Sequence, residues 1–229
     1  MQLKLVEKKQ ETSDCVTFIF ENAEQASWLA GQYFRYKLEN EAPDDRKITR
    51  YFTNAAAPFE NKIQITTRFA PEKSSTFKLD LQKLEVGAEI QVSGPFGDFT
   101  LEDPKGKKIC FIAGGIGVTP FRSILLQLDH EQKPIDITLL YANRNDEIIF
   151  KDEFDALAAK NSGLKLDYVI NPNKIEDAEI QKAVTDFATT IFYVSGPEPM
   201  VKGIAETLVK LGAIEENIKT DYFPGYEKH

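Results

Sequence analysis

The sequence is poor in the side chains that bind metals and iron–sulfur clusters. Among 229 residues it has two cysteines, Cys15 and Cys110, and two histidines, His130 and His229. Two cysteines cannot provide the four thiolates of an iron–sulfur cluster, and both lie in apolar, strand-like segments, where we expect inert core residues. The two histidines are too few and too far apart in the sequence to predict a metal site. The composition therefore disfavours metal chemistry.

The sequence also lacks an excess of positive charge and a long apolar run. It has 28 Lys and Arg residues against 36 Asp and Glu residues, a net charge of −8 and a pI of about 5.0. We do not expect such an acidic chain to bind nucleic acid or anionic membranes. Because there is no N-terminal signal pattern and no membrane-spanning apolar segment, we expect a cytoplasmic protein. The length fits one large domain or two small ones.

The first hundred residues predict a small antiparallel β-barrel. Short apolar or β-branched runs alternate there with polar, glycine-containing or proline-containing turns, which is typical of strands. The predicted strands are residues 3–6, 15–20, 33–38, 48–52, 62–68 and 89–92, with a helical insert at 74–84 and a turn at 93–99. Even spacing of short strands favours a barrel. The polar connector that follows predicts a boundary between a domain at 1–103 and a domain at 104–229.

The second half of the chain has a different pattern, in which strands alternate with helices. The predicted strands are 108–113, 135–141, 164–170 and 190–195, and the predicted helices are 120–129, 151–160, 176–186 and 197–211. This alternation predicts a parallel sheet with helices on both faces. Ligands of such sheets bind beyond the carboxyl ends of the strands. We therefore expect a two-domain chain, in which a barrel precedes an α/β nucleotide-binding domain.

A glycine-rich segment lies between the first strand and the first helix of the predicted α/β domain. It reads Gly114-Gly115-Ile116-Gly117-Val118-Thr119-Pro120. Glycines allow a positive φ and a close approach of the backbone to a ligand. The helix start, with Thr119 as the expected N-cap and Pro120 at the first helical position, offers free N–H groups to a phosphate. The segment fits neither the G-x-G-x-x-G nor the Walker A pattern, so an ordinary tight turn remains an alternative.

Two segments of the barrel half are candidate anion sites. Arg50-Tyr51-Phe52-Thr53 ends a predicted strand, where an arginine can clamp a pyrophosphate and a threonine hydroxyl can donate to a ring nitrogen. Phe52 is expected to face away from Arg50. Lys73-Ser74-Ser75-Thr76 begins the helical insert and offers hydroxyls, a lysine and backbone amides. A surface arginine on an edge strand and ordinary N-capping explain these residues nearly as well.

Five motifs occur in the order found in one family. They are Gly31-Gln32-Tyr33, Arg50-Tyr51-Phe52-Thr53, Gly94-Pro95-Phe96-Gly97, the glycine-rich segment 114–120 and Ser195-Gly196-Pro197. With these motifs the chain resembles the ferredoxin–NADP reductase superfamily, in particular its compact bacterial flavodoxin/ferredoxin reductase-type and oxygenase-reductase-type members. The resemblance extends over residues 3–226. Each motif alone is weak, but five motifs in order on matching strands and turns are specific.

The resemblance implies that FAD binds the barrel domain. Arg50 would hold the flavin pyrophosphate, Phe52 would pack against the isoalloxazine ring, and Thr53 would reach the flavin N5 region. The other residues that it places at the FAD are Tyr51, Ile65, Thr66, Thr67, Lys73, Ser74 and Ser75. The chain departs from the family pattern at Phe52, where relatives have tyrosine, and at Glu72, where relatives have glycine.

The resemblance also implies that NAD(P)H binds the α/β domain. The positions that would hold the nucleotide are Gly114, Gly115, Ile116, Gly117, Thr119, Pro120, Gly196, Pro197 and Met200. Ser195 stands where relatives place a cysteine beside the nicotinamide. Asp221 matches a C-terminal acid beside the flavin, so Thr53, Ser195 and Asp221 are the expected catalytic residues. Phe223 and Tyr226 remain alternatives for the ring that covers the flavin.

The implied activity is that of a flavoprotein reductase. It would pass a hydride from NAD(P)H to FAD and then electrons to a separate flavodoxin, ferredoxin or oxygenase component. Arg144 is the only candidate arginine for a 2′-phosphate, which slightly favours NADH. We expect a monomer. The alternatives are a reductase of free flavins or quinones, and a non-catalytic flavin electron-relay module. An unrelated two-domain nucleotide enzyme would leave the barrel motifs unexplained.

Overall fold

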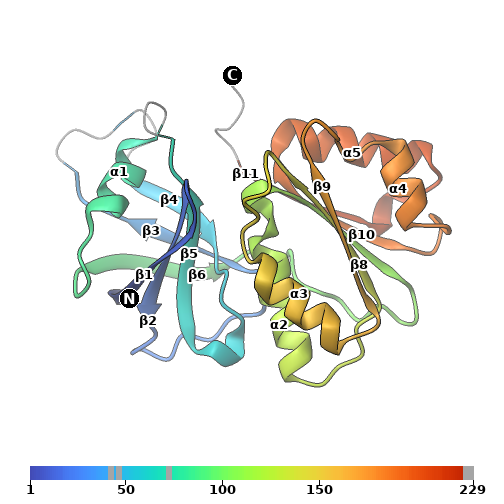
Figure 1. Cartoon of the computed structure of the whole chain (residues 1–229). Coiled ribbons are helices and arrows are strands. Elements are labelled where there is room, and N and C mark those ends of the chain that lie inside the picture. Colours follow the sequence, from blue (N-terminus) through green and yellow to red (C-terminus); the bar gives the residue numbers. More distant parts are fainter. Residues whose placement is uncertain (41–43, 45–47, 71–73, 224–229) are drawn as a thin grey trace.

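The chain folds into two halves, each built on its own sheet (Figure 1). The computed structural model describes residues 1–40, 44, 48–70 and 74–223. A six-stranded antiparallel sheet forms the first half and a five-stranded parallel sheet forms the second. The prediction of a barrel-like domain followed by an α/β domain is confirmed. The expected boundary after residue 103 lies between the last strand of the first sheet and the first strand of the second, and it stays a prediction.

The first sheet has the strand order β4-β3-β6-β1-β2-β5. Its strands are β1 (Gln2–Thr12), β2 (Cys15–Glu21), β3 (Tyr33–Lys37), β4 (Thr49–Thr53), β5 (Lys62–Arg68) and β6 (Glu89–Phe96), with a short 3₁₀ turn, η1 (Pro58–Glu60), and the helix α1 (Thr76–Lys83). Alternate side chains of these strands, such as Phe18 and Phe20 or Phe34 and Tyr36, are buried in one core. This period of two is what buries one face of a sheet.

The two outermost strands of the first sheet meet just after β4. Ala55 N donates to Gln64 O of β5 at 3.1 Å, and Gln64 N donates to Asn54 Oδ1 at 2.8 Å. Asn54 and Gln64 are both buried. These bonds satisfy backbone groups that a sheet edge would otherwise leave unpaired. The sheet therefore curls into a barrel, and the end of β4 is held against β5.

The second sheet has the strand order β11-β10-β7-β8-β9. Its strands are β7 (Ile109–Gly114), β8 (Ile137–Asn143), β9 (Leu164–Ile170), β10 (Ile191–Pro197) and β11 (Ile218–Phe223), with the 3₁₀ turns η2 (Gly115–Val118) and η3 (Glu215–Asn217). The helices are α2 (Thr119–His130), α3 (Lys151–Lys160), α4 (Asp177–Ala183) and α5 (Glu198–Lys210). The helices α2 and α3 cover the face next to the barrel, and α4 and α5 cover the other face (Figure 1).

Three details differ from the sequence-based expectations. Residues 93–96, predicted as a turn, continue β6, where Phe96 pairs with Tyr33 across the cis Gly94–Pro95 segment. The run at 218–223 forms an additional strand, β11, which pairs in parallel with β10. Thr119 is the first residue of α2 rather than its N-cap, because the 3₁₀ turn η2 leads directly into the helix, and the Thr119 hydroxyl donates to Ile116 O.

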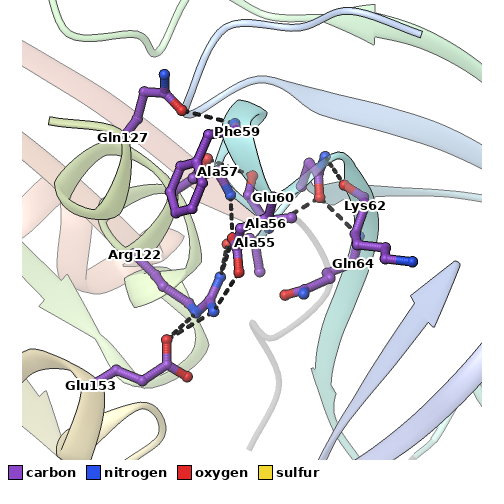
Figure 2. Close-up of polar contacts among 12 residues, drawn as sticks. Ala55, Ala56, Ala57, Phe59, Glu60, Lys62, Gln64, Arg122, Gln127 and Glu153 are labelled. Atoms are coloured by element: carbon purple, nitrogen blue, oxygen red, sulfur yellow. Dashed lines mark hydrogen bonds and ion pairs between the residues drawn. The ribbon is translucent and has the colours of Figure 1, made fainter. Parts of the chain in front are cut away.

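The two halves share a polar and an apolar contact. Arg122 of α2 donates to Ala55 O of the barrel at 2.8 Å and forms ion pairs with Glu60 and Glu153 (Figure 2). Ser123 donates to Ala56 O at 2.7 Å. Cys15, Ala55 and Phe99 from the barrel half join the core under α2 and α3. Because a buried guanidinium needs all of these acceptors, Arg122 fixes the end of β4 against α2.

Candidate functional site

Arg50 of β4 lies beside the start of α1. The Arg50 guanidinium carbon lies 5.6 Å from the ring centroid of Phe77, which is the second residue of α1. The ring of Phe52 lies 5.9 Å from the same Phe77 ring. The expectation that Phe52 faces away from Arg50 is wrong, because residues two apart in a strand point to the same face. Arg50, Phe52 and α1 therefore form one continuous surface.

This surface holds an anion supplied by the chain itself. Arg50 Nη2 donates to both carboxylate oxygens of Asp44, at 2.7 and 3.0 Å. The backbone N–H of Thr76, the first residue of α1, donates to Asp44 Oδ2 at 3.1 Å, and Asp44 N donates to Thr76 Oγ1 at 3.0 Å. A guanidinium and a free helix N–H are the two groups that bind phosphates best. We call Arg50 and the start of α1 the α1 cradle; its donor set fits a diphosphate.

The other predicted FAD residues have partners within the barrel half. Ser75 caps α1 by accepting from Lys78 N, and the Ser74 hydroxyl accepts from Ala70 N. Thr66 shares a hydrogen bond of 2.8 Å with Thr17. Ile65 is part of the barrel core, Thr67 is buried and Tyr51 is exposed. The predictions at Lys73 and Glu72 lie outside the described residues.

The glycines after β7 have a packing reason as well as a binding one. A Cβ on Gly117 would lie 2.3 Å from Ser195 O, and a Cβ on Gly114 would lie 2.3 Å from the Met200 sulfur. Gly115 has a φ of +52°. The turn η2 can therefore lie directly on β10 only if these positions carry no side chain. The close packing places the start of α2, led by Ile116, Thr119 and Pro120, at the carboxyl end of the sheet.

Three buried polar atoms at this sheet edge have no hydrogen-bond partner in the part of the chain that the structure describes. They are Tyr141 Oη and Asn143 Oδ1 at the end of β8, and Ser195 Oγ at the end of β10. Ser195 pairs with Ala113, and Ala113 pairs with Tyr141, so Ser195 and Tyr141 belong to one row across the sheet. Because native proteins rarely bury unpaired polar atoms, such a group is typical of a site that is completed by a ligand.

Asp221 adds an acid to the same row. It pairs with Ser195 across β10 and β11. Burial raises the pKa of the Asp221 carboxyl to about 6, and the negative charge of Asp98 contributes to the rise. A carboxyl with such a pKa exchanges a proton near neutral pH. The edge therefore combines an uncharged hydroxyl with an acid that can hold or release a proton.

The segment after β6 relates the barrel sheet to the sheet edge, at the seam between the halves. Thr53 pairs with Tyr33 in the barrel sheet, and a Cβ on Gly97 would lie 2.7 Å from the Tyr33 ring. The next residue, Asp98, is close enough to Asp221 to raise its pKa, and Asp221 pairs with Ser195. That Thr53 and Ser195 face one site stays a prediction.

The remaining predicted residues lie at the margin of this seam. A Cβ on Gly196 would lie 3.2 Å from Gly114 Cα, and Pro197 pairs with Phe223 at the ends of β10 and β11. Arg144 is exposed in the loop after β8. The alternative ring, Tyr226, lies outside the described residues.

Sequence reasoning missed Asp44, Tyr141 and Asn143. Tyr141 and Asn143 end a strand of a parallel sheet, where ligands bind, and this position was a usable signal. Asp44 lies between β3 and β4 in the sequence and contacts the start of α1, 32 residues away. No sequence pattern around Asp44 predicts that contact.

The described helices include none that is both long and apolar enough to cross a membrane.

Comparison with family models matches residues 2–101 to an oxidoreductase FAD-binding domain and residues 111–206 to an oxidoreductase NAD-binding domain. The first match contains all six strands of the first sheet, and the second match covers most of the second sheet but ends before β11. They assign FAD to the half that contains the α1 cradle and the nicotinamide nucleotide to the half that contains the sheet edge.

Individual relatives agree with these matches. A flavohemoprotein of Candida albicans is 29% identical over 215 residues, which cover 86% of this chain and 51% of that protein. A glycine betaine monooxygenase reductase subunit of Chromohalobacter salexigens is 25% identical over 92% of this chain and 60% of its own length. A ferredoxin-NADP⁺ reductase structure from Plasmodium falciparum has a TM-score of 0.83 at 16% identity, covering 97% of this chain and 95% of that one. The chain spans about half to three fifths of the length of these two curated relatives.

Proposed function

Because this chain has the FAD-binding and NAD-binding domains of oxidoreductases in the fold of the ferredoxin–NADP reductases, we propose that it oxidises NAD(P)H and passes the electrons through FAD to a separate acceptor protein. The observation that carries the proposal is the seam. The α1 cradle belongs to the barrel half, the buried polar atoms belong to the sheet edge, and the charge of Asp98, which follows β6, raises the pKa of Asp221 in β11. Two ligands held on these surfaces would have their rings in contact, which is the main requirement of hydride transfer.

Bound FAD would supply the redox chemistry, since it accepts a hydride and releases single electrons. The chain's own residues would bind and orient. Arg50 and the start of α1 would hold the diphosphate, and Phe52 would lie beside the flavin ring. Thr53 would donate a hydrogen bond at the ring edge.

At the sheet edge, the turn η2 would hold the nucleotide diphosphate. Ser195 would border the nicotinamide, with Gly196, Pro197 and Met200 shaping the pocket floor. Asp221 would hold a proton close to the reacting rings, because its pKa of about 6 allows either protonation state near neutral pH. Selectivity for NADPH needs cations that bind its 2′-phosphate. The loop after β8 offers one exposed arginine, Arg144, so the site favours NADH over NADPH.

The acceptor is proposed from the chemistry of the relatives. One similar protein is a monooxygenase reductase subunit and another is a flavohemoprotein, which supports an oxygenase or haem-containing acceptor. Flavodoxin and ferredoxin are the other candidates, as the name of the similar reductase structure indicates. The chain would act as a monomer in this role.

The test is NADH and NADPH oxidation by the purified chain with ferricyanide as the acceptor. We expect turnover with NADH that requires FAD and a lower rate with NADPH. A flavin-loaded chain that oxidises neither nucleotide would contradict the proposal and would favour a non-catalytic relay module.

One observation favours a second candidate, a reductase of free flavins. The α1 cradle already holds the carboxylate of Asp44, which would weaken flavin binding and let the flavin exchange as a substrate. Gel filtration of the FAD-loaded chain separates the two candidates. A bound cofactor stays with the protein at micromolar concentration, whereas an exchanging substrate leaves it and activity returns only with added FAD.

A further inference from the structure

The α1 cradle is filled from within the chain. Asp44 places its carboxylate on the Arg50 guanidinium and on the first N–H of α1, the groups expected to hold the flavin diphosphate. We propose that Asp44 is an internal competitor for that diphosphate, and that it sets how tightly the protein holds FAD relative to flavins that lack phosphate. This inference rests on the proposed function, because it takes FAD to be the ligand of the barrel half.

The geometry allows one anion at a time. Both oxygens of Asp44 lie within 3.0 Å of Arg50 Nη2, and Oδ2 also accepts from Thr76 N. A phosphate on the same donors would meet a carboxylate at contact distance, and two such charges repel strongly in a partly buried site. The side chains of Arg50 and Asp44 are only 13% and 21% exposed, so water screens that repulsion poorly. Asp44 must therefore move for a diphosphate to bind.

Moving Asp44 breaks a set of contacts, not one. Its carboxylate gives up Arg50 and the Thr76 N–H, and its backbone N–H gives up Thr76 Oγ1. FAD can bind only the fraction of molecules in which these contacts are open, so its apparent dissociation constant rises by the inverse of that fraction. Without the Asp44 carboxylate, FAD would no longer have to displace it from Arg50 Nη2 and Thr76 N.

The competition also predicts a selectivity. A ligand without phosphate makes no contact with the cradle and has no need to displace Asp44. The carboxylate therefore weakens FAD and leaves riboflavin unaffected. This difference separates competition at the cradle from a general loosening of the barrel.

The experiment measures dissociation constants of FAD and riboflavin by flavin fluorescence at fixed ionic strength, for the wild type and for Asp44→Asn. Asp44→Ser serves as a second variant with a smaller side chain. Glu39→Gln is the matched control, since it removes one exposed carboxylate from the same barrel half. We expect both Asp44 variants to bind FAD at least tenfold more tightly, with riboflavin binding unchanged, and Glu39→Gln to behave as the wild type.

A second readout does not depend on fluorescence. Added FAD should raise the melting temperature of Asp44→Asn more than that of the wild type, because ligand stabilisation grows with affinity. In an Arg50→Ala background the Asp44→Asn change should bring a smaller gain, since the contact with Arg50 is then absent and only that with Thr76 N is left to open.

The possible failures are distinguishable. Equal FAD affinity in the wild type and both Asp44 variants would overturn the inference and leave the proposed function intact. An equal gain for FAD and riboflavin would also overturn it, because the effect would not pass through the diphosphate. Absence of FAD binding in every folded variant would overturn the proposed function itself, and the inference with it.

Discussion

Two carboxylates at the proposed ligand sites have opposite surroundings. Asp44 lies in the α1 cradle against Arg50 and a helix N–H. Asp221 lies at the sheet edge, where burial and the charge of Asp98 raise its pKa. At the cradle, Arg50 Nη2 and Thr76 N donate to a carboxylate of the chain, whereas the buried edge atoms of Tyr141, Asn143 and Ser195 have no hydrogen-bond partner among the described residues.

This difference means that a ligand binds to the two sites by different steps. At the cradle, a ligand anion exchanges with an internal one, so the contacts that Asp44 gives up offset part of what the ligand gains. At the edge, a ligand adds hydrogen bonds where none exist, so it gains them in full. We therefore expect flavin affinity to depend on the charges of the cradle. Nucleotide affinity should depend on the rigid packing of the edge.

The largest expected effect is at the cradle. Replacing Arg50 with Ala should raise the FAD dissociation constant about 100-fold, because each charge-assisted hydrogen bond contributes about 1.5–3 kcal/mol. Binding of NADH, measured separately by calorimetry, should remain within about twofold. A loss of NADH binding as large as that of FAD would show that the two sites are not independent and would break the comparison.

The next effect tests the rigidity of the edge. Gly117→Ala would place a Cβ 2.3 Å from Ser195 O, and we expect it to lower the free energy of unfolding by about 2 kcal/mol, as overpacking does. Gly203→Ala, in α5 with no atom near its Cβ, is the matched control and should raise stability by up to about 1 kcal/mol. Urea unfolding of the two variants checks this. Equal stabilities would mean that the turn η2 is free to move.

A smaller effect concerns pH. The pKa of Asp221 is raised from 3.8 to about 6 in the folded protein, so the folded state holds a proton that the unfolded chain releases. The stabilisation from this proton is complete below about pH 4 and is lost as the pH rises through about 6. Between those values the wild type should lose on the order of 1–2 kcal/mol relative to Asp221→Asn. Urea unfolding at several pH values tests this, and parallel profiles would contradict the surroundings assigned to Asp221.

The smallest expected effect on stability is at Ser195. Its Oγ has no hydrogen-bond partner among the residues that the structure describes, so Ser195→Ala should change the free energy of unfolding by less than about 0.5 kcal/mol. The rate of flavin reduction by NADH should fall several-fold, because in the proposed complex the Ser195 hydroxyl borders the bound nicotinamide. A large loss of stability with an unchanged rate of flavin reduction would indicate a structural role for Ser195 instead.

Much of the fold could be predicted from local patterns. Alternation of strands and helices predicts the parallel sheet, since each pattern reports the burial of its own face. The extension of β6 through Gly94 and Pro95 could not be predicted, because glycine and proline usually mark turns and the pairing of Phe96 with Tyr33 is long-range.

Some residues of the candidate site could also be predicted from the sequence, and others could not. The motif around Arg50 and the glycine-rich segment could be recognised because their residues are adjacent in the sequence. Asp44 could not be assigned, since its role comes from Thr76, which follows two further strands. The raised pKa of Asp221 likewise depends on burial and on Asp98, which only the folded chain brings near.

The most direct measurement is an anaerobic absorbance spectrum of the FAD-loaded chain before and after one equivalent of NADH. If the two ligands meet at the seam between Thr53 and Ser195, the visible flavin band bleaches on mixing. A band that persists with NADH and with NADPH, while FAD stays bound, would contradict the central claim that the two halves bring their ligands together.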